Sequence, residues 1–424
     1  MLSKRFLVVL FACAGIFGLQ SARVWAGSTE QVLLAFDYFD GAQPFSGSLV
    51  FDSAGNLYGT TSFGYNPACP EGCGTVFELT PGSDGKWTHT ILHGFKGGSD
   101  GFQPDGTLIF DAAGNLYGVT SHGGNESCPT GCGTVYKLAP GPDGKWTKTV
   151  LHSFSGQDGA FPLGGLTLDS AGNLYGTTWQ GGDYQSCSQN GCGVVFKLTP
   201  GGQGKWTETV VLAFDGSDGS QPSGSLTFDA SGNLYGVTPE GGNYTACPSV
   251  GCGVVFELAP GTNGQWTETV LHAFSGHDGF APIGTLVFDV AGNLYGATSN
   301  IGESYGMVFE LSPGTGGTWT LTVLHVFTGK TAEYPTGVTL DAKGNLYGTT
   351  AESSTGDGIV YVLTGISGGK PNFEILHFFN STDGNSPQAA PILDAAGNLY
   401  GTTFWGGNLN DCANGCGVVF EITR

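Results

Sequence analysis

The chain is built from short runs of alternating apolar and polar residues, separated by turn-forming residues. One unit, 166–214, contains four such runs, at 166–169, 174–178, 193–198 and 206–214. Gly, Pro, Asn and Asp fill the positions between them. Runs of this length and period, bounded by these residues, are typical of β-strands joined by tight turns. The unit is therefore predicted to form four strands.

This four-run unit recurs along the chain. Its most constant part, Asp-x-x-Gly-Asn-Leu-Tyr-Gly, occurs seven times, centred on Leu57, Leu116, Leu174, Leu234, Leu294, Leu346 and Leu399. The centres are 52 to 60 residues apart, and four strands in such a period indicate the blades of a propeller. Asp and Gly at these places suit a type I turn with a bulge. We interpret the aspartates as turn-forming residues in preference to metal ligands.

The two ends of the chain complement each other. The final run, 417–422, corresponds to the third strand of a unit, whereas 31–36 resembles the fourth strand at 149–154. An N-terminal strand that completes the last unit would close the ring and remove its open edges. We predict an all-β fold, a seven-bladed β-propeller with four-stranded blades, in one domain, 27–424. An open β-solenoid is the alternative.

The first 26 residues are predicted to be a signal peptide. Lys4 and Arg5 form a positive start, 6–19 is apolar, and Ala26 is a small residue at a cleavage site. This apolar core is short for a membrane span, and no later segment is apolar enough to provide one. We expect a secreted or periplasmic protein. Lipidation at Cys13 is the minor alternative.

Ten of the cysteines form five close pairs. They are Cys69/Cys73, Cys128/Cys132, Cys187/Cys192, Cys247/Cys252 and Cys412/Cys416. Each pair lies in the loop expected between the second and third strands of a unit. Local pairing and an oxidising destination predict one disulfide bond in each of these loops. A structural zinc site needs four ligands together, whereas these pairs would lie on separate blades.

The charge of the chain limits the classes of partner that the protein is expected to bind. The formal net charge is −21, and removal of Lys4, Arg5 and Arg23 with the signal peptide would leave −24. Arg424 is then the single remaining arginine. Nucleic acids and anionic glycans are held by clustered Lys and Arg, so we expect neither as a partner. Neutral ligands, cations and proteins with a basic patch remain, and we expect a monomer.

Function is expected on one face of the ring. The loops from fourth to first strand and from second to third strand share a face in a propeller, and here they are long and variable. An Asp-Gly pair enters the first strand of six units. These carboxylates could ring the channel mouth and bind a cation such as Ca²⁺, although Asp-Gly is also a common turn former. The six aspartates are Asp40, Asp100, Asp158, Asp218, Asp278 and Asp383.

A second set of candidates on this face is aromatic and differs between units. Aromatic rings beside Asn, Asp and Gln suit the apolar faces and hydroxyls of neutral sugars, and equally suit a protein interface. The set comprises Phe63, Tyr65, Trp179, Tyr184, Tyr244, Tyr305, Phe404 and Trp405. The tryptophan that recurs at the start of the fourth strand, as at Trp206, is interpreted instead as a packing residue.

Patterns that indicate catalysis are sparse. A histidine recurs in one Leu-His slot of the fourth strand, which favours packing over general-base chemistry; these are His93, His152, His272, His325 and His377. His122 and His277 lie in loops without an identifiable partner. The sequence contains no nucleophile elbow, metal-binding His motif or phosphate loop. A glycosidase would need two opposed carboxylates, and non-repeated loop candidates are Asp183, Glu240, Glu303 and Glu352.

Three motifs recur in a fixed order and carry a family resemblance. They are Gly-Asn-Leu-Tyr-Gly-Thr-Thr, Gly-Thr-Val-Phe-Glu-Leu at 74–79 and Leu-His-Ser-Phe-Ser-Gly at 151–156. Together they resemble the GloVer tandem-repeat family of exported bacterial proteins over nearly all of the mature chain. The resemblance implies the repeat fold and export, and it implies no biochemical activity. Members often carry a C-terminal anchoring segment, whereas this chain ends at Arg424.

The sequence thus predicts an exported, non-catalytic propeller that binds a neutral glycan or a protein partner through its disulfide-bearing loops. Enzymatic activity is left unassigned. A carbohydrate-active hydrolase that uses loop carboxylates, and a structural protein of the envelope or matrix, are the alternatives.

Overall fold

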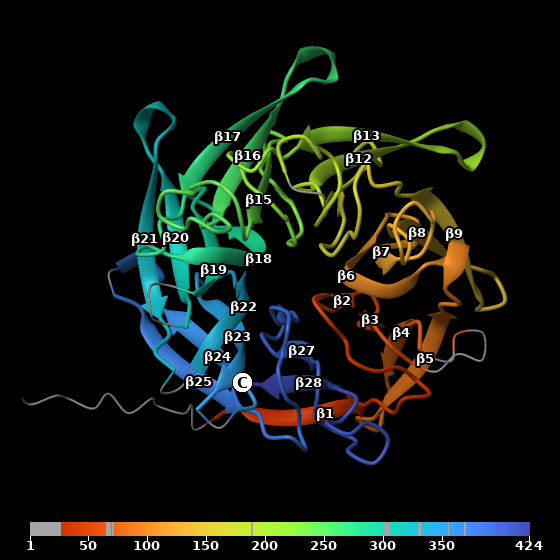
Figure 1. Cartoon of the computed structure of the whole chain (residues 1–424). Coiled ribbons are helices and arrows are strands. Elements are labelled where there is room, and N and C mark those ends of the chain that lie inside the picture. Colours follow the sequence, from red (N-terminus) through yellow and green to blue (C-terminus); the bar gives the residue numbers. More distant parts are fainter. Residues whose placement is uncertain are drawn as a thin grey trace, which may run out of the picture.

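The computed structural model describes residues 27–64, 69, 72–187, 190–300, 305–329, 332–354, 356–368 and 370–424. They form seven four-stranded antiparallel sheets arranged in a ring, a seven-bladed β-propeller (Figure 1). This confirms the predicted fold class. The predicted signal peptide and Cys13 lie outside the described residues.

Each blade runs from a strand beside the central channel to a strand on the outside of the ring. The inner strands are β2 (Val50–Phe51), β6 (Phe102–Phe110), β10 (Thr167–Leu168), β14 (Thr227–Phe228), β18 (Phe280–Phe288), β22 (Ala332–Leu340) and β26 (Ile392–Leu393). The second strands are β3 (Leu57–Thr61), β7 (Leu116–His122), β11 (Leu174–Thr178), β15 (Leu234–Thr238), β19 (Leu294–Asn300), β23 (Leu346–Ser353) and β27 (Leu399–Thr403).

The third and outer strands of each blade lie farther from the channel (Figure 1). The third strands are β4 (Thr75–Pro81), β8 (Thr134–Pro140), β12 (Val194–Pro200), β16 (Val254–Pro260), β20 (Met307–Pro313), β24 (Ile359–Thr364) and β28 (Val418–Thr423). The outer strands are β5 (Trp87–Gly94), β9 (Trp146–Ser153), β13 (Trp206–Ala213), β17 (Trp266–Ala273), β21 (Trp319–Val326), β25 (Asn372–Phe378) and β1 (Thr29–Ala35).

Helical structure in the described ranges is limited to single 3₁₀ turns. They are η1 (Gly98–Asp100), η2 (Gly202–Gly204), η3 (Thr262–Gly264), η4 (Thr315–Gly317) and η5 (Ile366–Gly368). None of the helices described is long and apolar enough to cross a membrane.

The ring closes through the N-terminal strand. β1 is the outer strand of the last blade and pairs with β28 in the order β1-β28-β27-β26. The register runs from Thr29 opposite Thr423 to Ala35 opposite Val418. The predicted closure is confirmed, and it leaves the first and last blades paired like any other neighbours.

The repeated Asp-x-x-Gly-Asn motif closes the hairpin between the inner and second strands. Asp169 accepts hydrogen bonds from the N–H groups of Ala171 and Asn173, at 2.9 and 2.8 Å. It also accepts from the Asn173 side chain at 2.7 Å and the Tyr175 hydroxyl at 3.1 Å. Burial alone would raise the pKa of Asp169, but these bonds outweigh it and lower the pKa. The turn-forming interpretation is confirmed.

The rest of the motif packs the blades together. Gly176 packs directly against the Phe196 ring. A Cβ at this position would lie 2.6 Å from the ring, so a larger residue does not fit. Tyr175 meets Phe228 and Trp266 of the next blade edge-on, with ring centroids 5.4 and 5.9 Å apart. The recurring tryptophans lie against the apolar clusters between blades, which confirms their interpretation as packing residues.

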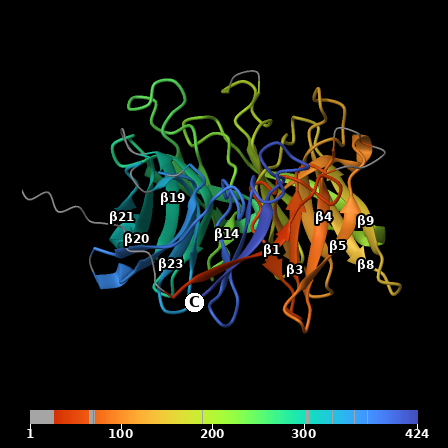
Figure 2. The same cartoon turned by 90° about the horizontal axis from the view of Figure 1, so that it is seen from below.

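The two faces of the ring differ in their loops. Figure 2 shows longer loops projecting from one side of the ring, whereas the chain ends on the other side. We call the first side the loop face. It carries the connections from second to third strand and from fourth to first strand. The other side, the turn face, carries the Asp-x-x-Gly-Asn hairpins.

Neighbouring blades are linked on the loop face by a backbone contact that we call the inner joint. The Gln221 N–H donates to the Cys192 carbonyl of the preceding blade at 2.8 Å. Equivalent donors occupy all seven blades with φ between 52° and 61°, and they are Gln43, Gln103, Phe161, Gln221, Ala281, Tyr334 and Ser386. None is glycine, so each costs on the order of 1 kcal/mol of backbone strain, which the surrounding contacts impose.

Candidate functional site

The loop face is held in shape by the five predicted disulfide bonds, and all five are present. The bonded pairs are Cys69–Cys73, Cys128–Cys132, Cys187–Cys192, Cys247–Cys252 and Cys412–Cys416. Their Cα atoms are 5.2 to 5.9 Å apart. The predicted pairing is confirmed. Multiple disulfides are consistent with an extracellular or periplasmic protein.

The two cysteines of each pair differ in burial. The sequence, which places both in a long loop, did not indicate this difference. The first cysteine of each pair is half-buried. The second is at most 3 % exposed and packs in the apolar clusters between blades; these residues are Cys73, Cys132, Cys192, Cys252 and Cys416. These five second cysteines belong to the core, so they are not available to a ligand on the loop face.

The buried cysteines also form the inner joints of their blades. The carbonyl groups of Cys73, Cys132, Cys192, Cys252 and Cys416 accept the N–H groups of Gln103, Phe161, Gln221, Ala281 and Gln43, in that order. Each disulfide thus ties the long loop to the point where its blade meets the next. This position explains the burial, because the inner joint lies between two packed blades.

Two of the predicted aromatic residues are exposed at equivalent places. Tyr184 is 40 % exposed and Tyr244 is 44 % exposed. Their hydroxyls lie over Gly156 and Gly216 of the turns that precede their blades. Trp179 and Phe63 are half-buried. Tyr65 lies outside the described residues.

A cluster of three aromatic residues lies at the junction of the last and first blades. Phe404 meets Trp405 with ring centroids 4.7 Å apart, and it meets Phe45 at 5.5 Å. Phe45 is 38 % exposed and lines the central channel. We call these three residues the aromatic cluster. It joins two residues of the loop that follows β27 and one residue of the segment that precedes β2.

Sequence reasoning missed Phe45. It follows the proline that starts the inner segment of each blade, and this position differs in every blade. The seven occupants are Phe45, Asp105, Leu163, Ser223, Ile283, Thr336 and Gln388. This variation within a constant frame was the available signal. Ring closure is what brings Phe45 next to Phe404, 359 residues later in the chain.

The central channel is neutral. A cavity of about 590 Å³ is lined by inner-strand residues of all seven blades, and its lining residues include no charged side chain. Hydroxyl groups are frequent, and among them are Ser46, Ser48, Thr107, Thr167, Ser223, Ser225, Thr285, Thr336 and Thr339. Apolar side chains fill most other positions. The described part of the channel therefore suits an uncharged occupant.

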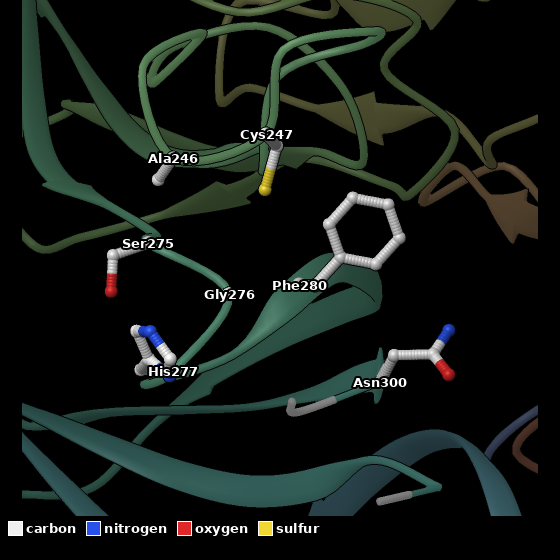
Figure 3. A pocket seen from close by; sticks show the side chains of 7 residues that line it. All are labelled: Ala246, Cys247, Ser275, Gly276, His277, Phe280 and Asn300. Atoms are coloured by element: carbon white, nitrogen blue, oxygen red, sulfur yellow. The ribbon is translucent and has the colours of Figure 1, made fainter. Parts of the chain in front are cut away.

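A smaller hollow of about 490 Å³ lies between the fourth and fifth blades on the loop face. Figure 3 shows the Phe280 ring and the Asn300 amide on one side, with Ser275 and His277 on the other. His277 is exposed, and the Cys247 sulfur closes the top of the hollow. This open hollow combines an aromatic ring with hydrogen-bonding groups.

The six Asp-Gly aspartates do not gather at the channel mouth. Asp158 accepts from the Ser155 N–H at 2.7 Å and pairs with His152 Nε2 at 3.0 Å. Asp100, Asp278 and Asp383 pair in the same way with the histidine of the outer strand that precedes them. Each aspartate therefore lies beside the outer strands. The six carboxylates thus do not converge on one place where they would bind a calcium ion together.

The slot histidines combine the predicted packing with this contact to an aspartate. His152 packs edge-on against Phe154, with ring centroids 4.8 Å apart. His325 has no aspartate at the corresponding place and stacks on Phe373 at 4.1 Å. Burial lowers the pKa of His325 to about 4, with a smaller effect from Lys370. Packing alone was predicted from the sequence, and the paired aspartate was missed.

A third residue completes each of these places, which we call the outer joints. It lies on the next blade's outer strand, opposite the leucine or isoleucine near the end of that blade's third strand. In ring order from the first blade, the joints comprise His93/Asp100/Lys148, His152/Asp158/Glu208, Leu212/Asp218/Glu268, His272/Asp278/Leu321, His325/Phe373, His377/Asp383/Glu30 and Leu34/Asp40/His89. Strand register places these positions equivalently, while their chemistry differs from joint to joint.

The pKa values at each outer joint depend on the residue that the next blade's outer strand contributes. Lys148 lies 3.0 Å from Asp100, and the pKa of Asp100 is lowered by hydrogen bonding to His93 and by the Lys148 charge, against the effect of burial. Where the third residue is acidic, burial raises its pKa, to about 7 for Glu208 and Glu30 and to about 8 for Glu268.

The loop carboxylates proposed for hydrolysis are dispersed over several blades. Asp183 accepts from the N–H groups of Gln185 and Ser186, as a loop-capping residue does. Burial raises the pKa of Glu240. Glu352 lies opposite Glu333 in the β22–β23 pair. Glu303 lies outside the described residues.

The sequence itself decides the family. A model of the Gloeobacter/Verrucomicrobia repeat matches residues 13–247 and 247–424. The chain belongs to the Gloeobacter/Verrucomicrobia repeat family. This confirms the resemblance drawn from the three recurring motifs. A search of curated proteins found no match. The repeat family and the fold therefore fit a non-catalytic propeller, without naming a partner.

Proposed function

We propose that this member of the Gloeobacter/Verrucomicrobia repeat family is an exported binding protein that holds a neutral glycan on its loop face, without catalysis. The aromatic cluster at the mouth of an uncharged channel carries the proposal. The Phe45 ring is partly exposed there, 5.5 Å from Phe404, which in turn meets Trp405.

The chemistry of the cluster and the channel suits a sugar. The apolar faces of a pyranose ring pack on aromatic rings, and its hydroxyls need hydrogen-bonding partners at the edges. Serine and threonine hydroxyls of the channel, together with the Gln388 amide, supply such partners next to Phe45. Both requirements are met at one place.

The charge of the protein supports a neutral ligand. The formal net charge is −21, and the channel lining contains no Lys or Arg among the described residues. Recognition of sulfate, phosphate or uronate groups uses fixed cationic donors, above all the guanidinium fork of arginine. An uncharged glycan is not repelled by the negative net charge of the protein, and it does not need cationic donors. The five disulfides support a location in an oxidising compartment outside the cytoplasm.

A protein partner is the second candidate, and the loop tips favour it. Exposed apolar side chains are present on several of these loops, including Tyr184, Tyr244, Val250 and Leu409. Such residues commonly anchor protein interfaces. A partner of this kind would use the loop tips, whereas a glycan would use the aromatic cluster.

Binding of neutral oligosaccharides to the mature protein tests the proposal. A panel that includes β-glucans, mannans and xylans would be screened on an array, and the affinity of each hit measured by calorimetry. We expect Trp405→Ala and Phe45→Ala to weaken binding roughly tenfold or more. Tyr184→Ala, an aromatic truncation at a loop tip, should leave the affinity unchanged.

The outcomes separate the candidates. Absence of binding across the panel would contradict glycan recognition, and affinity lost on Tyr184→Ala but kept on Trp405→Ala would place recognition at the loop tips. New reducing ends released from the same polysaccharides would support the hydrolase alternative instead.

A further inference from the structure

The outer joints repeat one geometry with different chemistry, and this allows them to be compared with one another. Six of the seven joints bring together a residue of the outer strand, an aspartate of the following turn, and a residue of the next blade's outer strand, and the joint of His325 and Phe373 lacks the aspartate. Backbone position is therefore constant, and the side chains alone change. Differences between joints report what each set of side chains can hold.

At the first joint the protein supplies its own cation. Lys148 Nζ lies 3.0 Å from Asp100 Oδ1, and His93 Nε2 lies 3.1 Å from Asp100 Oδ2. The Lys148 side chain is only 4 % exposed, so the ammonium group is enclosed in the joint. A positive charge beside the His–Asp pair is thus compatible with this geometry.

Two other joints have a carboxylate where the first has the ammonium group. Glu208 occupies the place of Lys148 and faces His152 and Asp158. Glu30 occupies the same place at the closure of the ring, where it faces His377 and Asp383. In each joint the three residues offer one imidazole nitrogen and two carboxylate oxygens, all within 4.8 Å of one another.

Both of these joints contain buried side-chain atoms without a hydrogen-bond partner in the described ranges. The Oε1 atoms of Glu208 and Glu30 are buried and have no hydrogen-bond partner among the described residues. His377 Nε2 is also buried and has no hydrogen-bond partner within the described part of the chain. Its nearest acidic neighbour is Asp383, whose Oδ2 lies 3.4 Å away. Burying a polar atom without a partner is costly, so these atoms call for a ligand that accepts their lone pairs.

We propose that the joints His152/Asp158/Glu208 and His377/Asp383/Glu30 each bind a divalent transition-metal ion, with Zn²⁺ as the fitting ion. Three protein ligands of the His and carboxylate type, in a set of this size, leave a fourth position for water around tetrahedral zinc. Calcium takes six to eight oxygen ligands and does not favour imidazole. The first joint, with its enclosed lysine, takes no metal.

These sites differ from the glycan site in position and in role. They lie between outer strands, whereas the aromatic cluster lies at the central channel. Glu30 belongs to β1 and its two partners belong to the preceding blade, so a metal there would hold the closing strand to the ring. The same ligand set at Glu208 would link the second and third blades.

Zinc titration of the metal-stripped mature protein tests the proposal. The protein would be treated with chelator, dialysed and titrated with ZnCl₂ by calorimetry, and bound metal counted by elemental analysis. We expect two ions per chain, one for each of the two candidate clusters. Glu208→Gln and Glu30→Gln should each remove one ion, and the double variant should remove both.

Matched variants separate metal loss from unfolding. His152→Leu reproduces the Leu212 found at the third joint, and Glu208→Leu reproduces the Leu321 found at the fourth, so the fold accepts both side chains. Each should keep the circular dichroism spectrum and lose one ion. Glu268→Gln alters the third joint, where leucine stands in place of the histidine, and should retain two ions.

Cobalt gives an independent signature. Co²⁺ bound in the two joints should produce visible absorption bands of a tetrahedral site, with intensity halved by either single variant. Failure to bind zinc, or equal zinc uptake by the wild type and the Glu30→Gln/Glu208→Gln double variant, would overturn the proposal.

Discussion

Two sets of repeated aspartates lie on opposite faces of the ring, and they behave differently. On the turn face, Asp169 and its six equivalents make the same hydrogen bonds within their own hairpins. On the loop face, Asp100, Asp158, Asp278 and Asp383 pair with a histidine of the preceding outer strand, whereas Asp218 and Asp40 have leucine in that place. The facing residue of the next blade varies among Lys, Glu, Leu and His. A repeated residue with constant partners serves the fold. Repeated residues with changing partners are where chemistry can differ between blades.

The largest expected effect contrasts two glycines with similar backbone conformations. Gly193 follows Cys192 of the inner joint and has φ +87°, and an added Cβ would overlap the Thr178 carbonyl and lie 2.8 Å from Pro222 Cδ. Gly172, on the turn face, has φ +83° with its nearest atom 3.9 Å away. We expect Gly193→Ala to lower the free energy of unfolding by about 4 kcal/mol and Gly172→Ala by about 1 kcal/mol. Denaturant unfolding measures both, and equal losses would contradict the contrast.

Removing a turn-face aspartate should have the next largest effect. Asp169→Ala leaves the Asn173 side chain and the Tyr175 hydroxyl without their acceptor, so we expect a loss of about 2 kcal/mol in the free energy of unfolding. Asp183→Ala, which removes a loop-capping carboxylate, serves as the control and should cost less. A loss no larger than that of the control would show that the hairpin network contributes little.

The disulfide bonds should contribute modestly. Cys187 and Cys192 are separated by five positions, and closing so short a loop stabilises the folded state by about 2 kcal/mol or less in the chain-entropy account. The double variant Cys187→Ser/Cys192→Ser should therefore fold with a slightly lower melting temperature. A protein that no longer folds would assign the disulfide a larger role than holding its loop.

The smallest effect depends on pH and concerns the third outer joint. Burial, with the Asp218 charge, raises the pKa of Glu268 from its usual 4.5 to about 8. The folded protein then binds this proton more tightly than the unfolded chain, so stability falls as the pH rises from about 4.5 to 8. Glu268→Gln should be more stable than the wild type at pH 8, on the order of 1 kcal/mol after allowance for solvent screening.

The stability of Glu268→Gln relative to the wild type is measured at acidic pH as well as at pH 8. Near pH 4.5 the advantage of Glu268→Gln should vanish, because the glutamate is then protonated in the folded protein. Glu126→Gln, in an exposed loop, controls for the loss of one acidic residue. A stability difference that does not change with pH would contradict the assignment.

The fold was predictable because its determinants are local and repeated. The alternation of apolar residues defines each strand, Asp169 and its equivalents define each hairpin, and the resemblance of 31–36 to a fourth strand identifies the closing strand. The disulfide pairs were predictable for the same reason, since their partners are four or five residues apart. The burial of the second cysteine was not, because it depends on how one blade packs against the next.

The site was predicted less completely because its parts come from different blades. Glu30 meets Asp383 and Phe45 meets Phe404 only because the ring closes, and no spacing in the sequence encodes either contact. Glu208 lies close to Asp158 because the outer strand of the third blade is next to the turn that leaves the second blade. The sequence did contain a signal, since these positions vary inside an otherwise constant repeat.

The claim that function lies with the blade-specific residues of the loop face is tested most directly by a crystal structure with a bound neutral oligosaccharide. We expect a sugar ring packed on Phe45 and Trp405 at the loop-face end of the channel. A sugar bound instead over the Asp-x-x-Gly-Asn hairpins of the turn face would contradict it.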